Sequence, residues 1–281
     1  MCARSRCHAS APLTTSAPPP APAPPSWFDG GYASDMKDSI VALLNASQPD
    51  AAAFGGLGVS PNPICWIGTE SGAPGGDIWS TGGNGLGDPN SPTVCPKACD
   101  TTLQDGDHWF FTAGDAIRTR AQLIEVYHGT VGRNGVLELD FAINRDGLVE
   151  PAHAARYKEL GDWARSCYGA PRWELANATC AAQQCVLELE LDPAGAAVDR
   201  VMIREEIGLG QRVRAYTVQA MTLGSTAWQA FSSGKAVGNK RIDLTKEPVV
   251  ATKLRLTVSA FAGADALLVK QFAAFTPVGC S

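Results

Sequence analysis

Two short segments of the chain each end an apolar run with a carboxylate. Residues 27–30 read Trp-Phe-Asp-Gly and residues 66–72 read Trp-Ile-Gly-Thr-Glu-Ser-Gly, so the two acids are Asp29 and Glu70. Two carboxylates at one site can perform glycoside hydrolysis, in which one attacks the anomeric carbon or activates water and the other protonates the leaving oxygen. The chain has 28 acidic residues, and most such side chains are simply solvated, so the pair alone is a weak indication.

The elements around the two acids alternate between strand-like and helix-like segments. Apolar residues at helical spacing over 36–44 predict a helix, with Ser34 as its cap. Short buried strands are predicted at 51–55 and 64–68. A strand that ends at Asp29, a helix, and further strands that end before Glu70 would place both acids at the carboxyl ends of parallel strands. Active sites of (β/α)8 barrels gather at that edge.

The alternation continues to about residue 168. Residues 71–102 are rich in Gly, Pro and Asn and are predicted to form a long loop that faces the substrate. A helix follows from about 117 to 129, then a strand at 136–142, and then a helix at 151–167 that begins with proline. The first half of the chain is therefore predicted to be α/β.

The second half shows a different pattern. Apolar residues alternate with a period of two, and Gly, Pro and Asp turns separate the segments, which predicts a β-sandwich. The predicted strands are 185–191, 198–205, 214–221, 227–231, 253–258 and 267–275. The boundary between the two halves is predicted near Pro171.

Composition excludes several classes of partner. The net charge of −5 provides no basic surface for nucleic acid or an anionic membrane, so neither is expected as a partner. No apolar run approaches the roughly 20 residues that span a bilayer. The first thirty residues lack the continuous apolar core of a secretory signal, because prolines interrupt residues 11–25.

Nine cysteines point to an oxidising compartment. The close pairs Cys95/Cys99 and Cys180/Cys185 bracket short loops, as in many secreted proteins. A zinc site at the first pair would need two more ligands, of which His108 supplies at most one, so no metal is expected.

Two Asn-X-Ser/Thr triplets, at 45–47 and 177–179, fit the glycosylation pattern. Together with the cysteines they indicate an extracellular, secretory or lysosomal-type location, although no signal peptide is visible in the chain.

Residues 27–168 resemble the carboxyl-terminal part of α-L-fucosidases of glycoside hydrolase family twenty-nine. Segment 27–30 resembles the nucleophile motif of that family, and 48–51 (Gln-Pro-Asp-Ala) resembles the start of its next strand. Segment 66–72 resembles the acid/base region of the plant-like branch that cuts α-1,3 and α-1,4 fucosides. Segments 107–111 and 131–139 also resemble family segments, so the similarity extends over several elements.

The resemblance implies a retaining, exo-acting α-L-fucosidase. Asp29 would be the nucleophile and Glu70 the acid/base, the substrate would be a fucosylated oligosaccharide or glycoprotein glycan, and no cofactor is implied. Trp66, Trp79 and Trp109 are candidates to stack on a sugar ring, although large aromatic residues near a barrel mouth belong to the core at least as often.

The resemblance also implies that part of the barrel is missing. Family members carry several strands ahead of the nucleophile, with histidines that hold the fucose hydroxyls, whereas here a proline-rich tract precedes Trp27. His108 and His128 are expected to be structural and not to replace those histidines. The 281-residue chain is therefore expected to hydrolyse fucosides poorly or not at all.

The expected architecture is α/β plus all-β. It comprises a Pro/Ala-rich low-complexity segment (1–26), the carboxyl-terminal part of a (β/α)8 glycosidase barrel (27–171) and a β-sandwich (172–281). Segment 198–213 resembles the discoidin-like, or galactose-binding-like, sandwich of many fucosidases. An alternative is a non-catalytic carbohydrate-binding or remnant protein in which only the sandwich is autonomous, because a half barrel leaves a strand edge unpaired.

Overall fold

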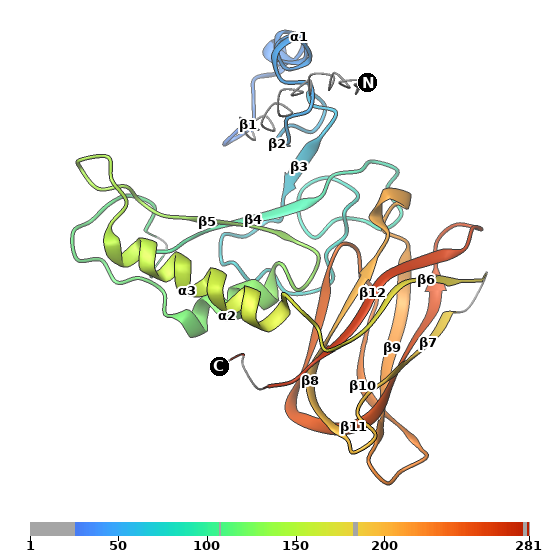
Figure 1. The fold of residues 1–281 in the computed structure, drawn as a ribbon. Helices are drawn as coiled ribbons and strands as arrows, with labels where there is room; N and C mark the ends of the chain where they lie inside the picture. The colour runs from blue at the N-terminus through green and yellow to red at the C-terminus, as the bar shows by residue number, and fades with distance from the viewer. Residues whose placement is uncertain (1–25, 107, 182–184, 278–279, 281) are drawn as a thin grey trace, which may run out of the picture.

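Two sheets organise the chain (Figure 1). The computed structural model describes residues 26–106, 108–181, 185–277 and 280, so the predicted low-complexity segment lies outside the described residues except for Ser26. A five-stranded parallel sheet is formed by the first half and a seven-stranded antiparallel sheet by the second. Within the described ranges, no helix has the length and apolar content needed to cross a membrane.

The parallel sheet follows the order of the sequence, β1-β2-β3-β4-β5, as in part of a (β/α)8 barrel. Its register pairs Trp27 with Phe54, and Phe54 with Ile64. The strands are β1 (Ser26–Trp27), β2 (Ala53–Phe54), β3 (Pro63–Trp66), β4 (Lys97–Thr102) and β5 (Val136–Asp140). The α/β prediction for this half is confirmed, with strands shorter than the sequence pattern indicated.

The helices lie close to their predicted positions. They are α1 (Lys37–Ser47), α2 (Arg120–Gly129) and α3 (Pro151–Tyr168), with short 3-10 turns η1 (Ser34–Met36) and η2 (Ile207–Leu209). The prediction of Ser34 as a cap is wrong, because Ser34 begins η1 and α1 has no side-chain cap. By contrast, Thr119 and Gln122 form a reciprocal capping box at the start of α2.

Strand β4 was not predicted, because it falls within the expected loop 71–102. All six of its residues are buried, including Lys97 and Asp100, whose charges hide the strand pattern in the sequence. Lys97 is satisfied by backbone: its Nζ donates to the carbonyls of Gly82 (2.7 Å), Gly83 (2.7 Å) and Cys95 (2.8 Å). Burial lowers the pKa of Lys97 to about 8. The loop between β3 and β4 is therefore shorter than expected and is held by a buried lysine.

The antiparallel sheet has the order β10-β9-β11-β8-β12-β6, with β7 paired to β11. Its strands are β6 (Trp173–Cys180), β7 (Cys185–Glu190), β8 (Ala196–Glu205), β9 (Val213–Thr222), β10 (Trp228–Gly234), β11 (Arg241–Phe261) and β12 (Leu267–Phe275). Strand β6 was not predicted, and β11 is much longer than the predicted 253–258. Residues 241–250 of β11 pair with β8, whereas residues 251–261 pair with β9.

Helix α3 joins the two halves. Its side chains Trp163 and Tyr168 pack in one buried cluster with Met202 of β8 and Phe275 of β12. A disulfide between Cys167 and Cys280 links the end of the helix to the end of the chain. The halves therefore share a core as well as a connecting segment.

The other disulfides support one of the two close cysteine pairs. Cys180 and Cys185 are bridged. Cys95 is bridged to Cys65, 30 residues away, and Cys99 is a buried free thiol, so Cys95 and Cys99 do not form a pair. Cys99 lies within β4, and its thiol contacts the carbonyl of Thr69.

Candidate active site

A cleft of about 830 Å³ opens at the carboxyl ends of the first strands. Asp29, Glu70 and Trp66 line it together with Asp100 and Asn84. The structure thus brings the two predicted carboxylates and one of the three predicted tryptophans to the same cleft. Both carboxylates are exposed, as groups that meet a substrate must be.

Asp29 lies in a tight turn that directly follows β1. The amide of Phe28 donates to the carbonyl of Phe54 (3.0 Å), which continues the ladder, and Gly31 closes the turn on the Phe28 carbonyl (2.9 Å). At the end of β2, Gly55 has φ +68, and a Cβ there would lie 2.7 Å from the Phe28 carbonyl oxygen. A glycine is therefore required for the turn that presents Asp29.

Glu70 stands between two anchored residues. The Cys99 thiol contacts the carbonyl of Thr69 at 3.1 Å, and Arg118 donates to the carbonyl of Ser71 at 3.3 Å. Burial raises the pKa of the Cys99 thiol to about 11, so this thiol is a neutral donor. The backbone on both sides of Glu70 is fixed while its side chain is left free to face the cleft.

Trp66 is oriented by Asp100, a residue that the sequence pattern did not single out. Its indole nitrogen Nε1 donates to Asp100 Oδ1 at 3.0 Å. Asp100 is 8% exposed and pairs in register with Glu138 of β5. Burial and the carboxylates of Asp140 and Asp100 raise the pKa of Glu138 to about 7, so the wall of the sheet beside the cleft is acidic and partly protonated near neutrality.

Residues Trp79 and Trp109 are not among the described residues that line this cleft. Trp79 is buried, and the guanidinium carbon of Arg214 lies 5.0 Å from its ring centroid. Trp109 is 36% exposed in the loop after β4. Their roles in sugar binding stay predictions of the sequence.

The two histidines singled out in the sequence have protein partners. His108 Nδ1 lies 3.0 Å from Asp115 Oδ2, and His128 Nε2 lies 2.6 Å from the Tyr168 hydroxyl. Burial and Arg200 lower the pKa of His128 to about 4, so it is neutral and does not act as a cation at the end of α2. No cluster of three His, Cys, Asp or Glu side chains suited to a metal ion occurs among the described residues.

Comparison with known proteins confirms the resemblance to α-L-fucosidases. The chain is 25% identical over 279 residues to alpha-L-fucosidase 1 of Arabidopsis thaliana, which covers 83% of this chain and 54% of the relative. It is 26% identical over 300 residues to a putative alpha-L-fucosidase 1 of Oryza sativa subsp. japonica, and this match covers 89% of this chain and 56% of the relative. The chain thus spans about half the length of these relatives. No family model matches it.

Solved structures agree on the fold. A putative alpha-L-fucosidase from Bacteroides thetaiotaomicron superposes with a TM-score of 0.77 at 29% identity, covering 89% of this chain and 59% of that one. A family 29 fucosidase from Ruminococcus gnavus, solved with fucose, superposes with a TM-score of 0.75 at 20% identity. This match covers 89% of this chain and 60% of that one. The partial parallel barrel and the antiparallel sheet are therefore shared with fucosidase structures.

Proposed function

We propose that this protein is a retaining α-L-fucosidase, or a part of one, that releases terminal α-L-fucose from oligosaccharides or glycoprotein glycans. The observation that carries the proposal is the common cleft of Asp29 and Glu70, each at the end of a parallel strand, in a chain similar to fucosidases in sequence and fold. Trp66, held by Asp100, supplies an aromatic wall to the same cleft.

The proposed reaction uses each carboxylate in a separate role. The Asp29 carboxylate attacks the anomeric carbon as the bond to the leaving oxygen breaks, and Glu70 gives its proton to that oxygen. Glu70 then removes a proton from water, which attacks the glycosyl-enzyme, restores the Asp29 carboxylate and gives fucose with retained configuration. Such sites hold their carboxyl groups about 5 to 5.5 Å apart.

Two further features belong to the same proposal. The antiparallel unit would be a discoidin-like β-sandwich spanning 172–281, which is supported by the way β11 pairs with β8 along its first half and with β9 along its second. An extracellular or lysosomal-type location is supported by three disulfides and by the exposure of Asn45 and Asn177.

The test traps the covalent intermediate, because trapping does not require fast turnover. The 281-residue chain is incubated with a 2-fluoro-fucosyl fluoride and digested, and the labelled peptide is identified by mass spectrometry. We expect the label on Asp29, its loss in Asp29→Asn, and full labelling in Asp35→Asn, which changes an exposed acid of η1 outside the cleft lining. Label on another residue, or none, would contradict the nucleophile assignment.

Glu70 is tested by its dependence on the leaving group. Where the unaltered protein releases fucose from a natural fucoside at a measurable rate, Glu70→Gln should lower that rate by about a thousandfold, equivalent to about 4 kcal/mol of barrier. The same variant should affect release from an activated aryl fucoside much less. Equal losses on both substrates would remove Glu70 from the acid/base role.

A second candidate function is fucoside binding without turnover. Fucose affinity with no trapping and no release would select this alternative.

A further inference from the structure

Part of the loop between β3 and β4 is a folded unit that reaches the cleft. Asn84 lines the cleft, and the amide of Gly85 donates to the carbonyl of Trp66 at 2.8 Å. The unit is closed by its own hydrogen bonds, such as Trp79 N to Leu86 O at 2.8 Å. Gly87 has φ +86, and a Cβ there would lie 2.3 Å from the Trp79 carbonyl oxygen. Residues 79–88 therefore form one hydrogen-bonded unit, so the contacts at the base of this unit contribute to the position of Asn84.

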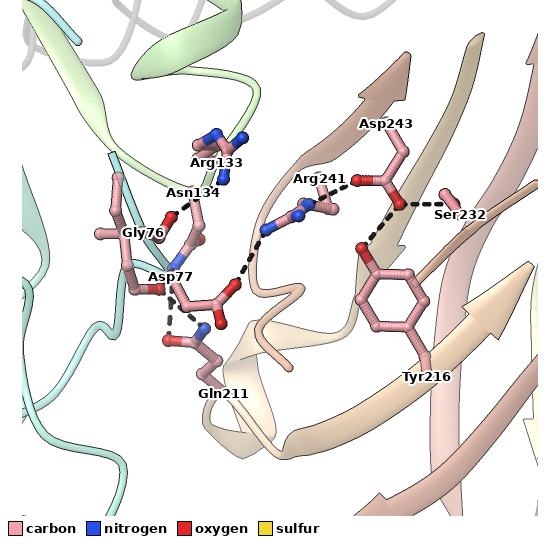
Figure 2. A network of polar contacts seen from close by, with 10 residues as sticks. Gly76, Asp77, Arg133, Asn134, Gln211, Tyr216, Ser232, Arg241 and Asp243 are labelled. Atoms are coloured by element: carbon pink, nitrogen blue, oxygen red, sulfur yellow. Dashed lines mark hydrogen bonds and ion pairs between the residues drawn. The ribbon is translucent and has the colours of Figure 1, made fainter. Parts of the chain in front are cut away.

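Gln211 of the antiparallel unit holds that base. Its Oε1 accepts from the amide of Ser80 at 2.6 Å, and its Nε2 donates to the carbonyl of Ile78 at 3.1 Å. Asn134, which follows α2, donates to the same carbonyl at 3.2 Å and to Gln211 Oε1 at 3.2 Å. Gln211 is 8% exposed and 131 residues from Ser80. The two amide side chains together satisfy two backbone groups of the loop. Figure 2 shows Gln211 and Asn134 side by side, with the contact between their amide groups.

Asn134 in turn is fixed by the antiparallel unit. It has φ 74, a conformation that asparagine tolerates better than most residues, and its Oδ1 accepts from the amide of Asn239 at 2.7 Å. Gly238 packs against it so closely that a Cβ there would lie 2.2 Å from Asn134 Oδ1. The pair formed by Asn134 and Gln211 is therefore rigid.

Two arginines of the same sheet support the unit at neighbouring points. Arg241 forms an ion pair with Asp77 at 3.0 Å and is itself anchored by Asp243 at 2.7 Å (Figure 2). Arg214 donates to the carbonyl of Pro89 at 2.8 Å. The antiparallel sheet thus contacts the unit directly before and directly after the segment that reaches the cleft.

We propose that Gln211 is a positioning residue for the cleft: from the loop that leads into β9 it fixes residues 78–80 and so influences where Asn84 stands in the fucose site. The inference rests on the proposed function, because it takes the cleft to bind fucose. Without the Gln211 amide, the Ser80 N–H loses its partner in a partly buried place, and the segment must shift to pair it again. A displacement of about 1 Å at a site is enough to weaken its action markedly.

The experiment compares Gln211→Met with Gln229→Met in the full chain. Gln229 is exposed on β10, so the second variant makes the same chemical change in the same antiparallel unit away from the loop. Backbone hydrogen exchange of residues 78–88 and the dissociation constant for L-fucose are measured at a temperature where all proteins are folded. For Gln211→Met we expect exchange faster by about tenfold or more and fucose affinity weaker by about fivefold or more. Gln229→Met should match the unaltered chain in both.

A third variant separates positioning from general stability. Gln211→Glu keeps an oxygen acceptor for the Ser80 amide, so affinity should be partly rescued relative to Gln211→Met. Unchanged exchange, or faster exchange with unchanged affinity, overturns the positioning role, while fucose binding by the unaltered chain leaves the proposed function standing. Failure of the unaltered chain to bind fucose overturns the proposed function and the positioning role for fucose with it.

Discussion

Replacement of Glu138 by glutamine should make the protein more stable at alkaline pH. Glu138 lies on β5 beside Asp100 of β4, and Asp140 follows two residues later on the same face. Burial, and then the charges of Asp140 and Asp100, raise its pKa from 4.5 to about 7. The same causes, burial and Asp100, raise the pKa of Asp140. Ionised Glu138 is therefore unfavourable in the folded protein.

The sign and size of the effect follow from the two pKa values. Below pH 4.5 the folded and unfolded chains both carry a neutral Glu138, and no penalty arises. As pH rises from 4.5 to about 7, the unfolded chain loses its proton first, so the free energy of unfolding falls, and above about 7 the penalty is complete. The difference between a pKa of 4.5 and one of about 7 corresponds to about 3 kcal/mol, which solvent screening of this half-buried side chain reduces to about 1 to 2 kcal/mol.

The assay is urea unfolding of the unaltered chain and Glu138→Gln at pH 5 and pH 8.5. We expect Glu138→Gln to be more stable by about 1 to 2 kcal/mol at pH 8.5 and by less than half of that at pH 5. Glu125→Gln, which changes an exposed acid on α2, is the control and should show no such dependence. A stability gain of the same size at both pH values would refute the reasoning, because it would arise from packing and not from charge.

Three further predictions concern stability and reactivity. Arg241→Ala should lower the free energy of unfolding by about 3 to 5 kcal/mol in denaturant titration, since it leaves the buried carboxylate of Asp243 and the partly exposed carboxylate of Asp77 without their cation. A loss below about 1 kcal/mol would show that these ion pairs add little to stability. Thr119→Ala should cost about 1 kcal/mol by removing the capping box of α2, and thermal melting with no change in midpoint would contradict the contact. The Cys99 thiol should resist alkylation by iodoacetamide at pH 8 in the native protein, because it is buried and its pKa is raised to about 11. Peptide mass spectrometry should show that it reacts only after unfolding, and rapid labelling of the native protein would contradict its burial.

The parts of the site that could be predicted are those that local sequence defines. Asp29 and Glu70 each follow an apolar run, and the carboxyl end of a parallel strand is where such residues meet, so their common cleft follows from strand order. Asp100 was missed because β4 contains a buried lysine and a buried aspartate, and both look like loop residues by composition. A period of two over Ala98, Asp100 and Thr102 was the available signal, but it carries no hydrophobic contrast.

Contacts between the halves of the chain were beyond local reasoning for a different reason. The amphipathic pattern of α3 predicts that Trp163 is buried, but periodicity does not say against what, and the structure places it with Met202 and Phe275 of the antiparallel sheet. Gln211 presents the harder case, because a single glutamine in a loop has no pattern at all, and its partners Ile78 and Ser80 lie more than 130 residues away. Buried amide pairs of this kind form only in the folded protein, where each buried donor must meet an acceptor from a distant part of the chain. If the two halves of the chain folded separately, Gln211 could be left exposed. In this protein the halves share the cluster around α3 and the buried pair of Asn134 and Gln211. The shape of the cleft therefore depends on the integrity of the antiparallel sheet.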